Sequence, residues 1–368
     1  MKIGLLKEIK KEEYRVALTP LSAQEYIKNG HEVIVESHAG EGSGFSDQEY
    51  TSTGCRIESS KQAVFDQADM IVHVKEPLEE EYGLFHQGQI VYTYLHLAAN
   101  KVLTEALLKQ KVIGVAYETI TEKDGSLPLL IPMSQVAGRL SVQEGAKYLE
   151  RPSGGRGVLL GGVPGIRKGK VVIIGGGIVG TNACKMAVGL GAEVVIMDIS
   201  TSRLSYLDDI FGSKITTMYS NHYNIEKEIK EADLVVGAIL IPGGAATPKL
   251  IKKEDLKKMK KGAVIVDVAV DQGGCAETTR PTSHADPTFV VDGVVHYCVA
   301  NMPGAVGLSA THALTSVTNT YGVMIANLGI DKALESYQPI LTGLNVYKGR
   351  LTNKAVAKAL GLKYSAYR

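Results

Sequence analysis

One stretch of the chain, residues 170–198, limits the possible folds more than any other. Residues 170–174 are a β-branched run typical of a buried parallel strand, and Gly175, Gly177 and Gly180 follow with G-x-G-x-x-G spacing. The first glycine permits a tight turn, the second lets backbone approach a diphosphate, and the third lets a helix pack close to the strand. The stretch therefore predicts a dinucleotide-binding βαβ unit.

The rest of this stretch indicates which dinucleotide is bound. A helix is expected at 178–190, with its free N–H groups facing the phosphates, and a second strand at 194–197. Asp198 ends that strand, where its carboxylate can accept hydrogen bonds from both ribose hydroxyls and repels a 2′-phosphate, so NAD is favoured over NADP. Arg203 could partly neutralise this charge, and we expect it beside the adenosine. The alternative is an ordinary βαβ unit that binds no ligand.

Composition excludes several classes of protein. With 368 residues, 45% apolar and 21% charged, the chain has the composition of a globular protein with room for two domains. A net charge of +1 does not favour nucleic acid or an anionic membrane as a partner. Four cysteines lack the paired spacing of a zinc site, and no signal segment opens the chain, so we expect a cytoplasmic protein with reduced thiols and no metal. No apolar run approaches the roughly 20 residues of a membrane span.

Alternating strand and helix patterns predict two α/β domains. Expected strands lie at 2–6, 33–35, 70–74, 90–94, 112–116, 214–218, 234–238, 263–268, 289–291 and 295–299. Expected helices include one beginning at Thr19–Pro20, one with a Ser46/Glu49 capping box, and those at 134–149, 225–230, 251–260, 309–328 and 331–341.

The predicted fold class is α/β, with two doubly wound Rossmann-like domains and an active-site cleft between them. Residues 1–128 with 309–368 are expected to form a substrate domain, and 129–308 an NAD-binding domain. The proline- and glycine-rich region from Pro128 to Gly165 is interpreted as the crossing between the domains, as hinge and helix together.

Four chemically active residues follow predicted strands, where ligands bind in open parallel sheets. Arg15 lies in the loop after the first strand, Lys75 after 70–74, His96 after 90–94 and Asp271 after 263–268. A guanidinium can grip a carboxylate, an ammonium can polarise a carbonyl or imine, and an imidazole can move a proton. The set suits a small carboxylate substrate held beside the cofactor.

Each of these residues also has a structural interpretation. Arg15 could belong to a solvated charge cluster, and Lys75 could be a surface lysine. His96 lies between two leucines, as a core histidine would, and Asp271 could cap a turn.

The combination of motifs resembles the alanine dehydrogenase family, within the superfamily that also holds the soluble nicotinamide-binding subunit of transhydrogenase. The segments that carry the resemblance span the chain in order: IGLLKEIKKEEYRVALTP, VHVKEP, TYLHLAAN, LLGGVPGI, IGGGIVGTNACKMAVGLGAEVVIMD, VVGAILIPG, VIVDVAVDQGG and VANMPGAVGLSAT. The resemblance implies reversible oxidative deamination of L-alanine to pyruvate and ammonia with NAD, in a homo-hexamer of two-domain subunits.

The resemblance also implies roles for single residues. Arg15, Lys75 and Asn301 correspond to substrate-binding positions, and His96 and Asp271 to the catalytic pair. Cofactor-contact positions are Ser134, Gly175, Gly177, Ile178, Val179, Gly180, Asp198, Arg203, Ser220, Ile239, Leu240, Val268, Asp271, Val299, Asn301 and Met302. Arg203 stands where the family often has lysine, which keeps the charge but changes the geometry.

The sequence departs from the family pattern at 154–157 and 243–247, and both departures are interpreted as loop variation. The histidine-bearing motif of the family is not apparent near Tyr347, so no metal site is predicted there. Three other functions stay open. A transhydrogenase subunit would need no substrate acid or base, an opine-type dehydrogenase would bind another substrate, and a catalytically silent NAD-binding protein would need no such set of residues.

Overall fold

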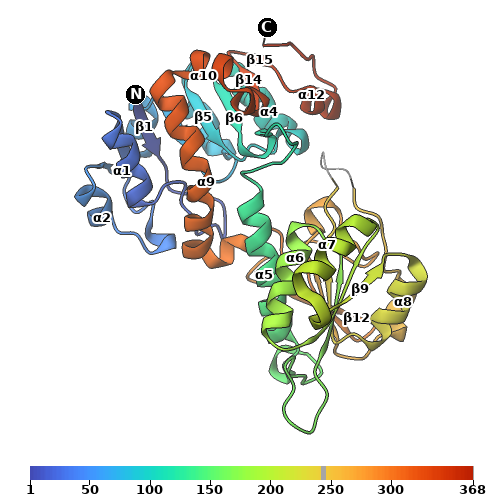
Figure 1. The fold of residues 1–368 in the computed structure, drawn as a ribbon. Helices are drawn as coiled ribbons and strands as arrows, with labels where there is room; N and C mark the ends of the chain where they lie inside the picture. Colours follow the sequence, from blue (N-terminus) through green and yellow to red (C-terminus); the bar gives the residue numbers. More distant parts are fainter. Residues whose placement is uncertain (242–245, 368) are drawn as a thin grey trace. The chain divides into compact units, whose positions relative to one another are not determined.

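The computed structural model describes residues 1–241 and 246–367 (Figure 1). The chain forms two compact units, Met1–Met133 with Gly304–Arg368, and Ser134–Pro303. It passes between them within helix α5 (Ile131–Tyr148) and within the 3-10 helix η10 (Met302–Val306). The glycine-rich segment 154–165 lies inside the second unit, so its predicted role as part of the crossing is wrong. Of the predicted loop variation at 243–247, residues 243–245 lie outside the described residues.

The first unit is built on a sheet whose order among the described residues is β15-β14-β6-β5-β4-β1-β2-β3. The strands from β3 to β6 are parallel, with β1 at the point where the winding reverses between β2 and β4. Next to β6, β14 runs antiparallel to it, and the edge strand β15 is antiparallel to β14. The strands are β1 (Lys2–Leu5), β2 (Glu32–Glu36), β3 (Arg56–Glu58), β4 (Met70–Val72), β5 (Ile90–Thr93), β6 (Ile113–Ala116), β14 (Leu344–Tyr347) and β15 (Arg350–Leu351).

Helices cover this sheet, and their ends follow the capping residues of the sequence. Thr19 Oγ1 accepts from Ser22 N at the start of α1, and Ser46 and Glu49 form the predicted capping box at α2. The helices are α1 (Pro20–Lys28), α2 (Asp47–Ser52), α3 (Lys61–Gln67), α4 (Lys101–Lys109), α9 (Gly307–Leu328), α10 (Ile330–Ser336), α11 (Gln338–Gly343) and α12 (Lys354–Leu360). Their apolar side chains and those of the strands form a buried core that includes Leu6, Phe65, Val91 and Leu107.

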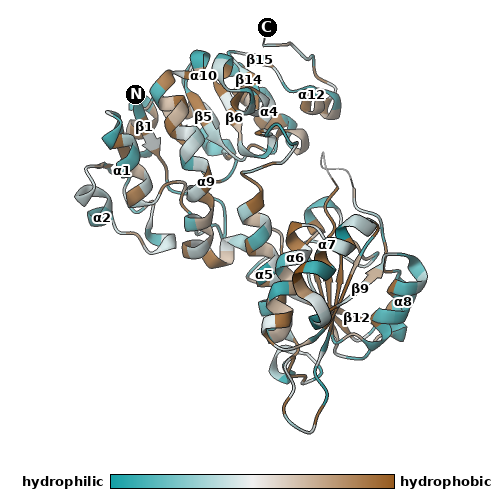
Figure 2. Cartoon of the chain, in the orientation of Figure 1, coloured by the Kyte–Doolittle hydropathy of each residue, from teal (hydrophilic) through white to brown (hydrophobic). Residues whose placement is uncertain are grey.

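The second unit has the order β12-β13-β11-β10-β7-β8-β9, in which β7 is flanked by β8 and β10. Its strands are β7 (Lys170–Ile174), β8 (Glu193–Asp198), β9 (Thr216–Tyr219), β10 (Leu234–Gly237), β11 (Val264–Asp267), β12 (Thr288–Val291) and β13 (Val294–Tyr297). Its principal helices are α5, α6 (Ile178–Gly189), α7 (Thr201–Phe211) and α8 (His222–Glu231). The central strands β7, β8, β10 and β11 are strongly apolar, and α8 presents a polar surface (Figure 2). Both sheets have the strand order of a doubly wound Rossmann-like fold, so the predicted α/β class with two doubly wound domains is confirmed.

Several elements differ from the sequence-based expectations. The helix expected at 251–260 is only a 3-10 helix, η8 (Lys253–Lys258). The one expected at 331–341 is split into α10 and α11 at Tyr337, two residues before Pro339, which disfavours a continuous helix. The strand β12 runs antiparallel to β13, so the sheet is not wholly parallel. In the described part of the chain, no helix is long and apolar enough to cross a membrane.

Candidate active site

The glycine turn of the second unit lies at the carboxyl end of β7, between β8 and β10. Gly175 N donates to Met197 O and Ala238 N to Ile174 O, both at 2.8 Å, so the turn is tied to its two neighbouring strands. A Cβ on Gly175, whose φ is +105°, would lie 2.6 Å from Ala238 O, and one on Gly180 would lie 1.8 Å from Gly175 O. Nothing lies within 4 Å of the corresponding position on Gly177. The turn is therefore closed against protein on two sides and open at Gly177.

A pocket of about 920 Å³ opens at this turn, within the second unit. Its size is that of a small-molecule or cofactor site. Many predicted cofactor residues line it: Ser134, Gly175, Gly177, Ile178, Val179, Asp198, Ser220, Ile239 and Leu240. The sequence analysis missed other lining residues, among them Ile199, Asn221 and Lys252. Ile199 directly follows Asp198 in the sequence, and this adjacency to the predicted ribose ligand could have indicated it.

Asp198 is held at the edge of this pocket by the backbone of the turn. Its Oδ2 accepts from Gly176 N at 2.7 Å and its Oδ1 from Ser200 N at 2.8 Å. Arg203 Nε donates to Gly176 O at 2.5 Å and its NH2 group to Thr181 Oγ1 at 2.6 Å. Arg203 forms no ion pair with Asp198 in the described structure, so its charge holds the turn and does not pair directly with the carboxylate. An open glycine turn, a helix amino terminus and this carboxylate together fit a dinucleotide.

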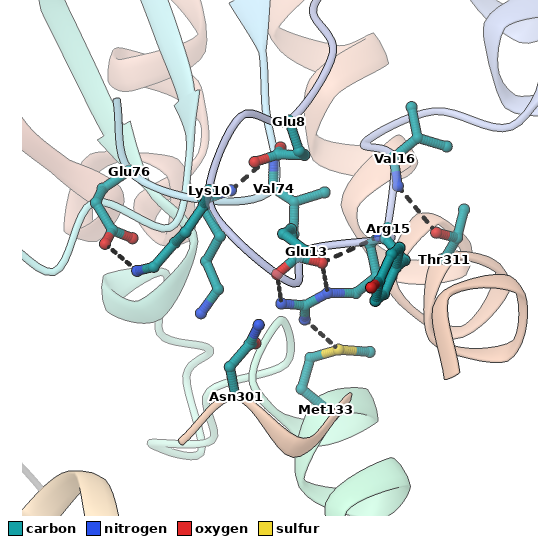
Figure 3. Close-up of polar contacts among 12 residues, drawn as sticks. Glu8, Lys10, Glu13, Arg15, Val16, Val74, Glu76, Met133, Asn301 and Thr311 are labelled. Atoms are coloured by element: carbon teal, nitrogen blue, oxygen red, sulfur yellow. Dashed lines mark hydrogen bonds and ion pairs between the residues drawn. The ribbon is translucent and has the colours of Figure 1, made fainter. Parts of the chain in front are cut away.

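Arg15 of the first unit is buried, with 3% of its surface exposed, so the interpretation of a solvated charge cluster is wrong. Its guanidinium forms a bidentate ion pair with Glu13. Arg15 Nε donates to Glu13 Oε1 at 2.6 Å, and Arg15 NH2 donates to Glu13 Oε2 at 2.5 Å (Figure 3). NH1 contacts Met133 Sδ at 3.1 Å, and thioether sulfur is a weak acceptor. Burial lowers the pKa of Arg15, but the bond and the charge of Glu13 outweigh it, so the pKa is raised and the residue stays cationic.

Helix α9 supports the loop that carries Arg15. Val16 N donates to Thr311 Oγ1 at 3.0 Å (Figure 3), and a Cβ on Gly307 would lie 2.7 Å from Tyr14 O. Helix α9, which begins just after the chain passes back into the first unit, therefore helps to position Arg15.

Lys75 follows β4, the strand beside β1. Burial is the largest cause that lowers the pKa of its ammonium, and the charges of Arg15 and Lys10 lower it further. Two cations, Arg15 and Lys75, thus lie at the switch point of this sheet, where an anionic ligand would relieve their mutual repulsion.

His96 lies after β5 and is exposed, so the interpretation of a core histidine is wrong. Its φ is +48°, an uncommon conformation for a residue other than glycine, and its N donates to Glu118 Oε1 at 2.6 Å. Its ring stacks on Tyr94 with centroids 5.8 Å apart. Glu118, which also accepts from Leu95 N at 3.2 Å, fixes this strained turn and was missed by the sequence analysis.

Comparison with known proteins gives the family. The model described as "Alanine dehydrogenase/PNT, N-terminal domain" matches residues 4–137, and "Alanine dehydrogenase/PNT, C-terminal domain" matches 141–354. The chain belongs to the alanine dehydrogenase/PNT family. It is 54% identical over 366 residues to "Alanine dehydrogenase" of Methanococcus maripaludis, covering 99% of this chain and 98% of that one. It is 53% identical over 364 residues to "Alanine dehydrogenase" of Halomonas elongata, with 99% and 98% coverage.

Solved structures agree with this alanine dehydrogenase/PNT assignment. A structure titled "L-alanine dehydrogenase" matches with a TM-score of 0.96 at 53% identity, covering 98% of this chain and 99% of that one. A transhydrogenase from Sinorhizobium meliloti matches with a TM-score of 0.82 at 24% identity, covering 96% and 100%, and shares the fold.

Most of the remaining predicted residues of this alanine dehydrogenase/PNT chain lie in the segments that follow β11 and β13, whereas Gly180 and Arg203 lie in α6 and α7. Asp271 is exposed in the 3-10 helix η9 (Val270–Gln272), which follows β11. Predicted cofactor positions that do not line the pocket described above are Gly180, Arg203, Val268, Asp271, Val299, Asn301 and Met302.

Asp267, at the end of β11, organises the loop that carries Asp271, and the sequence analysis missed it. The carboxylate is fully buried and accepts from Ala269 N at 3.1 Å, Cys275 N at 2.8 Å and Thr279 Oγ1 at 2.5 Å. Asp267 lies near the end of the predicted strand 263–268, just before a loop that contains Gly273 and Gly274, and this position could have indicated its role. In the described residues, no group of three or more histidine, cysteine or acidic side chains could hold a metal.

Proposed function

We propose that this chain is an NAD-dependent L-alanine dehydrogenase, which converts L-alanine reversibly to pyruvate and ammonia. The observation that carries the proposal is the match over essentially the whole chain, at 53–54% identity, to proteins named alanine dehydrogenase. The buried cation Arg15 and the neighbouring Lys75 support it, because a carboxylate substrate needs such partners. The first unit is the proposed substrate domain and the second the dinucleotide domain.

Arg15 and Lys75 would bind the substrate carboxylate and orient Cα. The dinucleotide, when bound along the glycine turn and Asp198, supplies the acceptor for the Cα hydride. His96 would act as general base for the water that adds to the imine, and as proton donor when the product amine leaves. Asp271 would orient the amine or the water. Asn301 is proposed to contact the substrate as well.

The enzyme would work as a homo-hexamer in the cytoplasm on L-alanine, pyruvate and ammonium, with no nucleic acid or membrane partner. NAD would be its cofactor, with no metal required.

A single assay tests the activity. We expect NADH oxidation with pyruvate and ammonium, slower turnover with glyoxylate or 2-oxobutyrate, and loss of turnover with intact NADH binding in His96→Ala. Hydride exchange between dinucleotides without pyruvate would favour the transhydrogenase alternative, and condensation of pyruvate with an amino acid would favour an opine-type dehydrogenase. NADH binding without any turnover would leave a silent NAD-binding protein.

Cofactor choice is tested at Asp198. Asp198→Gly removes the charge that repels a 2′-phosphate, so we expect the ratio of kcat/KM for NADH over NADPH to fall at least tenfold. Arg203, held on Gly176 O and Thr181, stays in place as a nearby cation. An unchanged ratio would refute the role given to Asp198.

A further inference from the structure

Two buried side chains beside Lys75 have no part in the proposed chemistry. Glu8 follows β1 and His73 follows β4, and their side chains are 3% and 4% exposed. Glu8 Oε1 lies 3.1 Å from His73 Nδ1. The same oxygen accepts from Val74 N at 2.6 Å (Figure 3). A buried acid and imidazole thus join the two strands at the switch point of the first sheet.

Both side chains also bond to the backbone of Lys75. Lys75 N lies 3.4 Å from Glu8 Oε1, and Lys75 O lies 2.8 Å from His73 Nδ1. Because a carbonyl only accepts, Nδ1 must carry the proton, and it is shared between Lys75 O and Glu8 Oε1. Thr93 Oγ1 donates to the same carbonyl at 3.0 Å. Both polar groups of the Lys75 backbone are therefore fixed by side chains.

The far ends of the pair bond to nothing in the described structure. Glu8 Oε2 and His73 Nε2 are buried without a hydrogen-bond partner. Buried polar atoms without a hydrogen bond lower the stability of the fold. A contribution to stability therefore does not explain why this pair is present. The bonds it does make all lead to residues 73–75.

The position of this backbone matters because the cations Arg15 and Lys10 repel the Lys75 ammonium. Burial is the largest cause that lowers the pKa of Lys75, the charges of Arg15 and Lys10 lower it further, and Glu13 and Glu76 raise it. Among the described residues, the ammonium forms no ion pair or hydrogen bond. A lysine side chain is flexible and would turn away from Arg15 if its backbone could move. The charge of Glu8 acts on Arg15, whose pKa it helps to raise.

We propose that Glu8 and His73 are positioning residues that hold the Lys75 backbone so that its ammonium stays beside Arg15 to receive the substrate carboxylate. This inference rests on the proposed function, in which Lys75 binds substrate. It predicts that the Nδ1 side of His73 is needed and the Nε2 side is not.

Two matched substitutions separate these sides. An asparagine amide can take the place of Nδ1–H, whereas a glutamine amide reaches the place of Nε2. With the full-length enzyme and saturating NADH and ammonium, we expect His73→Gln to raise the KM for pyruvate about tenfold, with kcat and the Kd for NADH changed less than twofold. His73→Asn should restore most of the pyruvate affinity. Glu8→Gln, which is isosteric and keeps an acceptor for Val74 N, should raise the pyruvate KM roughly threefold to tenfold.

Equal KM values for the asparagine and glutamine variants, each folded by circular dichroism, would overturn the proposal. So would a His73→Gln variant that lowers kcat and NADH affinity as much as pyruvate affinity. If both His73 variants fail to fold, Glu8→Gln decides: an unchanged pyruvate KM overturns the inference. Lys75→Met is the control for the underlying function. If it weakens pyruvate binding while His73→Gln does not, only the positioning role fails; if it leaves pyruvate binding unchanged, both assignments fail.

Discussion

At the scale of single residues, the site of the first unit is dominated by buried charge. Arg15 and Glu13 are buried together, so each compensates the other's cost of leaving water. The sequence indicated Arg15 as a ligand for a carboxylate, but it did not indicate that Glu13, two residues earlier, engages the same guanidinium. Spacing alone could not show it, because the bond depends on the path of an irregular loop.

Arg15→Ala is expected to act on both binding and stability. Loss of a charge-assisted bond should weaken pyruvate binding about tenfold or more with NADH binding retained. Glu13 would stay buried without its guanidinium partner, which should lower the free energy of unfolding by about 3 kcal/mol or more. The double variant Glu13→Gln/Arg15→Met removes both charges and should recover much of the stability without recovering pyruvate affinity. Urea unfolding and NADH-fluorescence titration measure the two effects, and recovery of both together would contradict a substrate role for Arg15.

Lys75 predicts a pH dependence. Burial, Arg15 and Lys10 lower its pKa from 10.5, so the ammonium loses its proton at a lower pH than an ordinary lysine. Because the charged form binds the carboxylate, pyruvate affinity should fall as pH rises through this lowered pKa. Titrating the enzyme–NADH complex with pyruvate, without ammonium, from about pH 7 to about pH 10 measures this fall. Lys75→Arg should shift it to higher pH, and identical profiles would assign the titration to another group.

At the scale of elements, prediction was best where the pattern is local and weakest at edges. β7 is found at the predicted residues 170–174, because a β-branched run that begins at Lys170 and ends before Gly175 defines both ends of a strand. β14 and β15 were missed, because they are short and pair antiparallel at the sheet edge, beside β6. The helix expected at 251–260 was wrong because η8 is only a short 3-10 segment, over Lys253–Lys258, although the charged run there resembles a helix surface.

Helix α6 offers a matched pair of glycine substitutions. In Gly180→Ala the new methyl would lie 1.8 Å from Gly175 O, so helix and turn must separate. We expect the Kd for NADH to rise at least tenfold and stability to fall by about 2 kcal/mol or more. Gly189→Ala, at the exposed end of the same helix, meets nothing within 4 Å and should leave NADH binding unchanged while stability rises by a few tenths of a kcal/mol. Isothermal calorimetry and thermal unfolding compare the two, and equal effects would contradict close packing at Gly180.

At the scale of the whole molecule, each unit has its own sheet and its own buried core. The sequence predicted two doubly wound folds because strand and helix patterns alternate along both halves. It placed part of the crossing in the glycine-rich segment 154–165, since composition marks loops but does not distinguish a loop within a unit from one between units. The roles of Glu8, Glu118 and Asp267 were out of reach for a related reason: each carboxylate acts on backbone N–H groups that only the folded chain brings to it.

This division predicts how ligands protect the chain from amide hydrogen exchange. NADH alone should slow exchange in the glycine turn at 175–181 and around Asp198, because its proposed pocket is built wholly from the second unit. Ligand at about 100 times its Kd stabilises the bound form by about 2.7 kcal/mol, which corresponds to roughly hundredfold slower exchange. Protection at 8–16 and 73–76 should appear only when pyruvate is added, since Arg15 and Lys75 belong to the first unit. Equal protection of those segments by NADH alone would contradict the separate assignment of dinucleotide and substrate to the two units.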